Sequence, residues 1–142
     1  MRRLVATFLA LLLLPALVHA VGDVPVRVRV LKGSRVAPAQ LDPKLEDVKK
    51  QLGKLSYTRW EQVADHRLTM TGKKTQFVDL PDGEHVALTL QEVRGDTVTF
   101  EVALAQHNTM SRLTIEKGQR IVHQVTREKG GVAYFVTVHA WP

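Results

Sequence analysis

Cysteine is absent from all 142 residues of this chain. Without cysteine the protein can form no disulfide and no thiolate metal site, and it has no lipobox cysteine for lipid attachment. Its fold must therefore be stabilised by apolar packing, for which 44% of the residues are hydrophobic. In an exported protein, the same absence fits a bacterial envelope better than a eukaryotic secretome.

Runs of like charge are also lacking. The chain carries 20 Lys and Arg residues against 14 Asp and Glu residues, a formal net charge of +6, and the basic residues are dispersed. Proteins that bind nucleic acid usually have a clustered basic surface. We therefore expect no nucleic-acid partner, although a weak attraction to anionic glycan or lipid surfaces is compatible with the charge.

Long hydrophobic runs are confined to the first 20 residues. Arg2 and Arg3 form a positive start, residues 4–17 are apolar, and Ala20 is the small residue expected at a cleavage position. The apolar run is short for a membrane span of roughly 20 residues, which favours a signal peptide over an N-terminal anchor.

We therefore expect cleavage after residues 1–20 and an exported protein, either periplasmic or extracellular. Residues 21–142 have the length of a single domain. Loss of the two arginines lowers the net charge from +6 to +4. No membrane span is expected to remain after cleavage.

The strongest structural pattern lies in residues 85–105, where apolar and polar residues alternate on both sides of an Arg-Gly-Asp turn. A period of two is typical of half-buried strands. A three-residue turn, which pairs Val93 with Thr97, sets Leu88 opposite Val102. A two-residue turn would instead expose one apolar face to water. The pattern therefore predicts a hairpin with the three-residue turn, at the centre of a β-sheet core.

Further segments have strand patterns and end at Gly-, Pro- or Asp-containing turns: 24–31, 55–63, 67–71, 75–79, 111–115, 120–126 and 132–140. Strands at such short spacing indicate one mainly-β domain, an antiparallel sandwich or small barrel of about eight strands.

Two of these segments are candidates for edge strands. In 24–31, valines alternate with Arg27 and Arg29, and Pro25 lacks a backbone donor, so we expect an edge strand with solvated arginines. Segment 132–140 is apolar on both faces, as in a strand covered on two sides, but is also a candidate for an edge.

Residues 43–52 have the periodicity of one short helix. Asp42 can serve as N-cap, Pro43 fits the first helical position and Gly53 supplies a stop. One apolar stripe runs along it, formed by Leu41, Leu45, Val48, Leu52 and Leu55. We expect this stripe to pack on a sheet; the alternative is docking on another protein.

Catalytic signatures are scarce. None of the serines lies in a Gly-x-Ser-x-Gly elbow, and no two histidines have a compact metal-binding spacing. Segments 67–71 and 75–79 are predicted to form a hairpin that places His66 opposite Asp79, a weak candidate for a metal or acid–base site. We expect no cofactor, and an enzyme is not favoured.

Aromatic residues make up only 6% of the chain. Tyr57, Arg59, Trp60 and Trp141 are the candidates for a face that binds a ligand or partner, because aromatic side chains on a β-surface suit recognition of sugars and peptides. Packing in the core is the alternative for the same side chains.

Four motifs together resemble small exported β-rich proteins of bacterial envelopes. They are Leu41-Asp42-Pro43, the sequence LGKLSYTRW at 52–60, LPDG at 80–83 and GGVAYFV at 130–136. The resemblance implies a β-rich fold and an envelope location, and no established activity accompanies it. Segment 120–129 departs from the pattern because it lacks a Gly-rich character.

The sequence favours an exported, non-enzymatic envelope protein that binds another protein through an edge strand or the amphipathic helix. A carbohydrate- or peptidoglycan-binding module is the first alternative. A small metal-dependent enzyme that uses His66 and Asp79 is the second.

Overall fold

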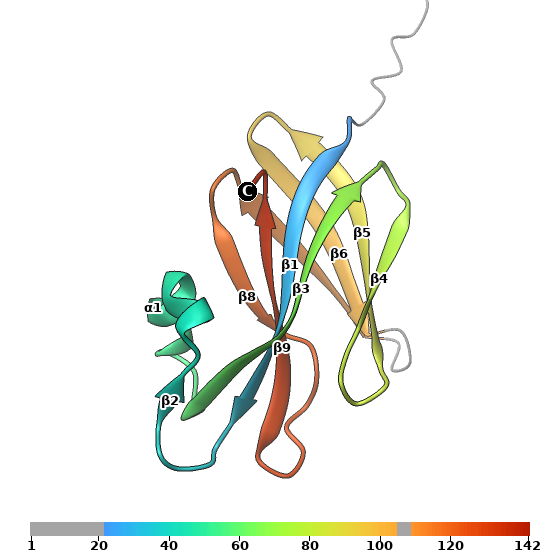
Figure 1. The fold of residues 1–142 in the computed structure, drawn as a ribbon. Helices are drawn as coiled ribbons and strands as arrows, with labels where there is room; N and C mark the ends of the chain where they lie inside the picture. Colours follow the sequence, from blue (N-terminus) through green and yellow to red (C-terminus); the bar gives the residue numbers. More distant parts are fainter. Residues whose placement is uncertain (1–21, 105–108) are drawn as a thin grey trace, which may run out of the picture.

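The computed structural model describes residues 22–104 and 109–142. These residues form nine strands in two sheets that pack face to face, with one short helical segment outside them (Figure 1). The prediction of one mainly-β domain, a sandwich or small barrel of about eight strands with one short helix, is confirmed.

Sheet A has five strands in the order β2-β3-β1-β9-β8, and sheet B has four in the order β4-β5-β6-β7. Sheet A contains β1 (Val24–Ser34), β2 (Gln40–Leu41), β3 (Arg59–Met70), β8 (Arg120–Gln124) and β9 (Val132–Ala140). Sheet B contains β4 (Thr75–Asp79), β5 (His85–Arg94), β6 (Thr97–Leu104) and β7 (Thr109–Glu116). The pairing of β2 with β3 is parallel, and the other pairings are antiparallel.

The central hairpin β5–β6 has the predicted facing residues, including Leu88 opposite Val102. The predicted three-residue turn is wrong, because Arg94 pairs with Thr97 across a two-residue turn. The register shifts between Leu90 and Glu92, so one extra residue on β5 restores the apolar alternation. A bulge thus does what the longer turn was expected to do.

The predicted hairpin of 67–71 with 75–79 is wrong. Strand β3 pairs with β1 in sheet A, whereas β4 pairs with β5 in sheet B. The connection between them carries the chain from one sheet to the other, and Met70 and Val78 both belong to the main core. His66 and Asp79 therefore lie in different sheets.

Neither predicted edge strand is an edge. Strand β1 lies at the centre of sheet A, and β9 lies between β1 and β8. Covering of β9 on both faces is confirmed, since Phe135, Val136, Thr137 and Val138 are all buried. The edges of the two sheets are β2, β8, β4 and β7.

The main core fills the space between the sheets with the inward faces of their strands. Sheet A contributes Val24, Val26, Val28, Val30, Met70, Val136, Val138 and Ala140. Sheet B contributes Val78, Val86, Leu88, Leu90, Val98, Phe100, Val102, Leu104 and Ile115. The valines of segment 24–31 thus face the core, as their alternation predicts.

A second core lies on the outer face of sheet A, beneath the helical segment. This segment is a 3₁₀ turn, η1 (Pro43–Val48), followed by α1 (Lys49–Leu52), and Asp42 caps it by accepting a hydrogen bond from the Lys44 N–H at 3.0 Å. Its buried residues are Leu45, Val48 and Leu52. They pack against four residues of sheet A: Leu31, Trp60, Ala133 and Phe135. Packing of the stripe on a sheet is confirmed, so this apolar face is not free for another protein.

Arg29 joins the helical segment to sheet A. Its side chain is buried, with 3% exposed, so the expectation of solvated arginines is wrong for this residue. The guanidinium donates to Thr137 Oγ1 and the Lys44 carbonyl, both at 3.1 Å, and to both Asp47 carboxylate oxygens at 3.0 and 2.7 Å. These partners compensate for the burial of the charge.

Asp47 also forms an ion pair with Arg120, with 2.9 Å between Asp47 Oδ2 and Arg120 Nε. Burial alone would raise the pKa of the Asp47 carboxyl. The hydrogen bonds and charge of Arg29, with the charge of Arg120, outweigh burial and hold this pKa below its usual value. The ion pair therefore favours the folded state wherever the carboxylate is charged.

We expect Asp47→Asn to lower the free energy of unfolding at pH 7 by about 2 kcal/mol, because it leaves Arg29 buried with no counter-charge. Since the folded pKa is lowered, the wild-type stabilisation is complete above about pH 4 and is lost as pH falls through the folded pKa. Urea denaturation at several pH values measures both effects. The control is Asp65→Asn, which breaks the more exposed Arg27–Asp65 pair and should cost less than about 1 kcal/mol. Equal losses would contradict the role of burial.

We also expect Leu88→Asp to cost about 4 kcal/mol, because it places an unpaired charge in the core at a side chain with 0% exposure. The neighbouring change Thr89→Asp, on the outer face of sheet B, should cost about 1 kcal/mol or less. Denaturant titration of both variants measures the difference, and similar costs would mean that the inward face is assigned wrongly.

Candidate functional site

Trp60 is part of the second core and does not form a binding surface. It is 5% exposed, and its ring packs edge-on against Phe135 and Tyr57, with centroids 4.8 and 5.7 Å apart. Gly33 lies against the same rings, where an added Cβ would come within 3.0 Å of Trp60. For Trp60, packing in the core is therefore the correct alternative.

Tyr57 and Arg59 lie beside this cluster, each half-buried. Arg35 sits over the Tyr57 ring at 4.9 Å and forms an ion pair with Glu128. Burial, followed by the nearby Glu128 carboxylate, raises the pKa of Tyr57. The Nε of Arg59 is buried without a hydrogen-bond partner among the described residues.

Trp141 does not pack in the cluster that contains Trp60 and Tyr57. It contacts the main core, and its N–H donates to the Pro25 carbonyl at 2.8 Å. The four predicted binding residues, Tyr57, Arg59, Trp60 and Trp141, therefore do not form one face. Trp141 fastens the end of the chain to the start of β1.

The predicted His66–Asp79 pair does not form. Asp79 instead pairs with His85 on the neighbouring strand, with 2.5 Å between Oδ1 and Nδ1. Both of these side chains are exposed. Within the described part of the chain, no three His, Asp or Glu side chains are grouped so that they could hold a metal ion.

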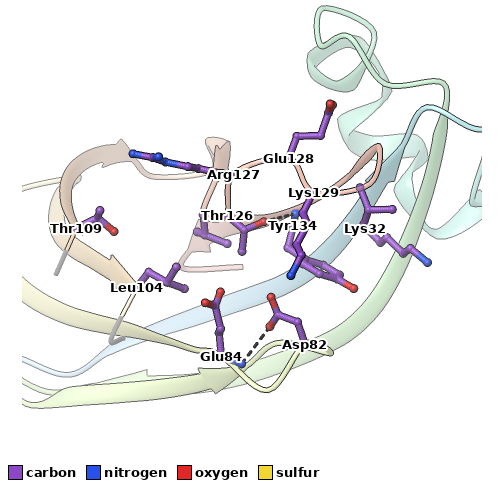
Figure 2. A pocket seen from close by; sticks show the side chains of 12 residues that line it. Lys32, Asp82, Glu84, Leu104, Thr109, Thr126, Arg127, Glu128, Lys129 and Tyr134 are labelled. Atoms are coloured by element: carbon purple, nitrogen blue, oxygen red, sulfur yellow. Dashed lines mark hydrogen bonds between the residues drawn. The ribbon is translucent and has the colours of Figure 1, made fainter. Parts of the chain in front are cut away.

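A cavity of about 910 Å³, here called the end cleft, opens at one end of the sandwich. Its lining comes from both sheets and the β8–β9 connection: Lys32, Asp82, Glu84, Leu104, Thr109, Val125, Thr126, Arg127, Glu128, Lys129, Val132 and Tyr134. Figure 2 shows Asp82 and Glu84 rising from the β4–β5 turn toward a wall that contains Thr126 and Tyr134.

Local hydrogen bonds fix both walls of the end cleft. Asp82 Oδ1 accepts from the Glu84 N–H at 3.0 Å, and Thr126 Oγ1 accepts from the Tyr134 N–H at 2.8 Å. Burial, and then the charges of Asp82 and Glu61, raise the pKa of Tyr134. Tyr134 is therefore a neutral hydroxyl beside carboxylates at physiological pH.

Basic side chains lie around the same cleft. Arg127 is at the end where Thr109 lies, and Lys32 is at the opposite end (Figure 2). Among the described residues, no ion pair involves Lys32, Arg127 or Lys129. The end cleft therefore offers cations at its ends and carboxylates between them.

A second hollow of about 290 Å³, here called the β7–β8 groove, lies where the edge of sheet B meets the edge of sheet A. It is lined by Val102, Leu104, Thr109, Ser111, His123, Gln124, Val125, Thr126 and Arg127. It shares five residues with the end cleft, so the two hollows adjoin: Leu104, Thr109, Val125, Thr126 and Arg127. Burial lowers the pKa of His123, which favours the neutral imidazole at this wall.

The outer face of sheet B carries an apolar row that crosses all four strands. Phe77 on β4 pairs with Ala87, which pairs with Ala103, which pairs with Met110 on β7. Phe77 is 63% exposed and Met110 is 67% exposed. Large apolar side chains thus stand at both edges of an otherwise polar face, with small ones between them.

The free edge of β7 exposes the backbone of alternate residues. The Lys117 N–H donates to the carbonyl of Asp96, in the turn before β6, at 2.7 Å, which fixes the phase of the β6–β7 ladder. Polar backbone groups of Ile115, Leu113 and Ser111 then point toward β6. Those of Met110, Arg112 and Thr114 point away from the sheet.

Neither a scan of protein-family models nor searches of curated proteins and of solved structures finds a match to this chain. In the described ranges, 22–104 and 109–142, no helix has the length and apolar character needed to cross a membrane.

Sequence reasoning missed the end cleft, the β7–β8 groove and the open edge of β7. The order of strands in each sheet determines all three, and no local pattern encodes that order. One signal was available: Phe77 and Met110 occupy positions that alternate with core residues, and so belong to the polar face.

We expect amide hydrogen exchange to alternate along β7. The N–H groups of Ser111, Leu113 and Ile115 bond to β6 and should exchange slowly, whereas those of Met110, Arg112 and Thr114 should exchange fast. NMR-detected exchange of the purified protein measures this. Slow exchange at all six positions would mean that the β7 edge is already paired in solution.

Proposed function

We propose that this chain is an exported, non-enzymatic envelope protein that binds another protein, and that sheet B carries the contact. The observation that carries the proposal is the row from Phe77 to Met110, whose two large apolar side chains stay exposed at the edges of sheet B. The chain's own helical segment packs on sheet A and leaves this row open.

The proposed contact has a favourable energy. Burying Phe77 and Met110 against a partner would contribute about 1–2 kcal/mol for each side chain. The alanines between them let a partner approach the sheet closely. Backbone groups at the open β7 edge add hydrogen bonds that are directional and independent of side-chain chemistry.

The proposed location rests on the sequence. A positive start, an apolar stretch and a small residue at position 20 are the features of a secretory signal peptide. The resemblance to exported envelope proteins agrees with this. A partner in the periplasm or at the cell surface is therefore proposed, and no cofactor is assigned.

A carbohydrate- or peptidoglycan-binding module is the second candidate. Trp60 does not support it, because that side chain is buried. The end cleft supports it, since Tyr134, Asp82 and Glu84 line the same cavity. An aromatic ring can stack on a sugar, and carboxylates can accept hydrogen bonds from its hydroxyl groups.

Photo-cross-linking in the native envelope tests the first proposal. A photoreactive amino acid replaces Met110 in one variant and Lys50, which is exposed on α1, in the control. We expect Met110 to give one dominant protein adduct and Lys50 to give at most a small fraction of that yield. No protein adduct at Met110, or equal yields at both positions, would contradict the proposal. Retention of the protein on washed cell wall without an adduct would favour the glycan candidate.

A further inference from the structure

We infer that the partner contributes one extended segment, which adds to the β7 edge as a further strand of sheet B and inserts an apolar side chain into the β7–β8 groove. This inference rests on the proposed function, because it specifies how the partner is held.

The backbone of β7 identifies the kind of occupant. Met110, Arg112 and Thr114 present N–H and C=O groups that no described strand uses. These residues repeat about every 7 Å along the strand. Only an extended polypeptide offers alternating donors and acceptors at that spacing, so the edge suits a strand better than a glycan or a helix.

The β7–β8 groove supplies a place for side chains. In an added strand, residues opposite Ser111 and Leu113 point toward the inside of the sandwich. There they meet the groove, whose walls include Val102, Leu104 and Val125. The inward positions of the segment should therefore be apolar.

The length of the segment is limited at the other end of β7. The N–H of Glu116 is already satisfied, because it donates to the side-chain Oε1 of Gln119 at 3.0 Å. The free ladder therefore runs from Met110 to Thr114, and the segment needs about five residues to cover it.

Arg127 adds a charge preference. It lines both the groove and the end cleft, near Thr109, and has no ion pair among the described residues. Figure 2 shows its side chain at the Thr109 end of the cleft. An acidic residue or terminal carboxylate of the segment should lie at this end.

Proline at position 112 separates strand addition from simple docking on the face of the sheet. Arg112→Pro removes an N–H that points away from the sheet, so the β6–β7 ladder stays complete and the edge strand tolerates the change. Arg112→Ala is the matched control, since it removes the same side chain and keeps the N–H. Circular dichroism and thermal unfolding check that both variants fold.

With the photoreactive residue at Met110, we expect Arg112→Pro to lower the adduct yield about 10-fold or more, and Arg112→Ala to change it less than about 3-fold. Ser111→Phe, which fills the groove from β7, should lower the yield as Arg112→Pro does and serves as the second variant if proline prevents folding. A peptide that spans the cross-linked segment is then synthesised. It should slow amide exchange at Met110, Arg112 and Thr114.

The outcomes separate the two proposals. If the photoreactive residue at position 110 gives no protein adduct in the otherwise unchanged protein, the proposed function and this inference are both contradicted. If the adduct forms but a folded Arg112→Pro variant and Ser111→Phe give the wild-type yield, the partner docks on the face of sheet B. In that case only the inference is overturned. An unchanged exchange rate at Arg112 in the presence of the peptide would also overturn it.

Discussion

The two sheets of this protein are covered unequally, and most of its features follow from that constraint. Sheet A buries side chains on both faces, toward sheet B on one side and beneath the helical segment on the other. On the outer face the buried Arg29 needs a counter-charge as well as apolar neighbours. Asp47 of the helical segment provides this counter-charge. Within residues 22–104 and 109–142, sheet B buries only its inner face, and no described element covers its outer face.

Unequal covering explains why the strands with the most apolar sequences are not the edges of the sheets. Strands β1 and β9 are rich in valine because neighbours lie on both of their faces and along both of their edges. Strand β7 has the opposite character, with exposed Met110, Arg112 and Thr114 on its outer side. An open edge in this fold is therefore polar in sequence.

Much of the fold could be predicted from residue periodicity. The alternation of β5 and β6 gave the facing of Leu88, and the stripe on residues 43–52 gave the packing of the helical segment. The pairing of β3 with β4 could not be predicted, because a short turn is compatible with both a hairpin and a crossing between sheets. The bulge near Gln91 was missed for a related reason: turn length and bulge compensate for each other in sequence.

The candidate site was less predictable than the fold. The chemistry of aromatic side chains suits both binding and packing. Trp60 packs over Gly33 in the second core, and Trp141 packs against the main core at the chain end. The burial of Arg29 was missed because alternation with valine places an arginine on the outer face without revealing what covers that face. The order of strands in a sheet, and the elements that pack on its faces, depend on contacts between residues far apart in the sequence. These contacts decide which surfaces stay open.

The two open edges of sheet B carry a hazard for the chain itself. Strand β4 ends the sheet on one side and β7 on the other, so β4 of one molecule can meet β7 of the next. Such a head-to-tail contact is heterologous, so its repetition gives a filament wherever the rotation between copies does not close a ring. Charge at Arg112 and Glu116 on β7 opposes uncontrolled pairing of this kind, and the Gln119 side chain shortens the usable ladder. The backbone groups proposed to bind a partner are thus the same groups through which copies of this chain could pair.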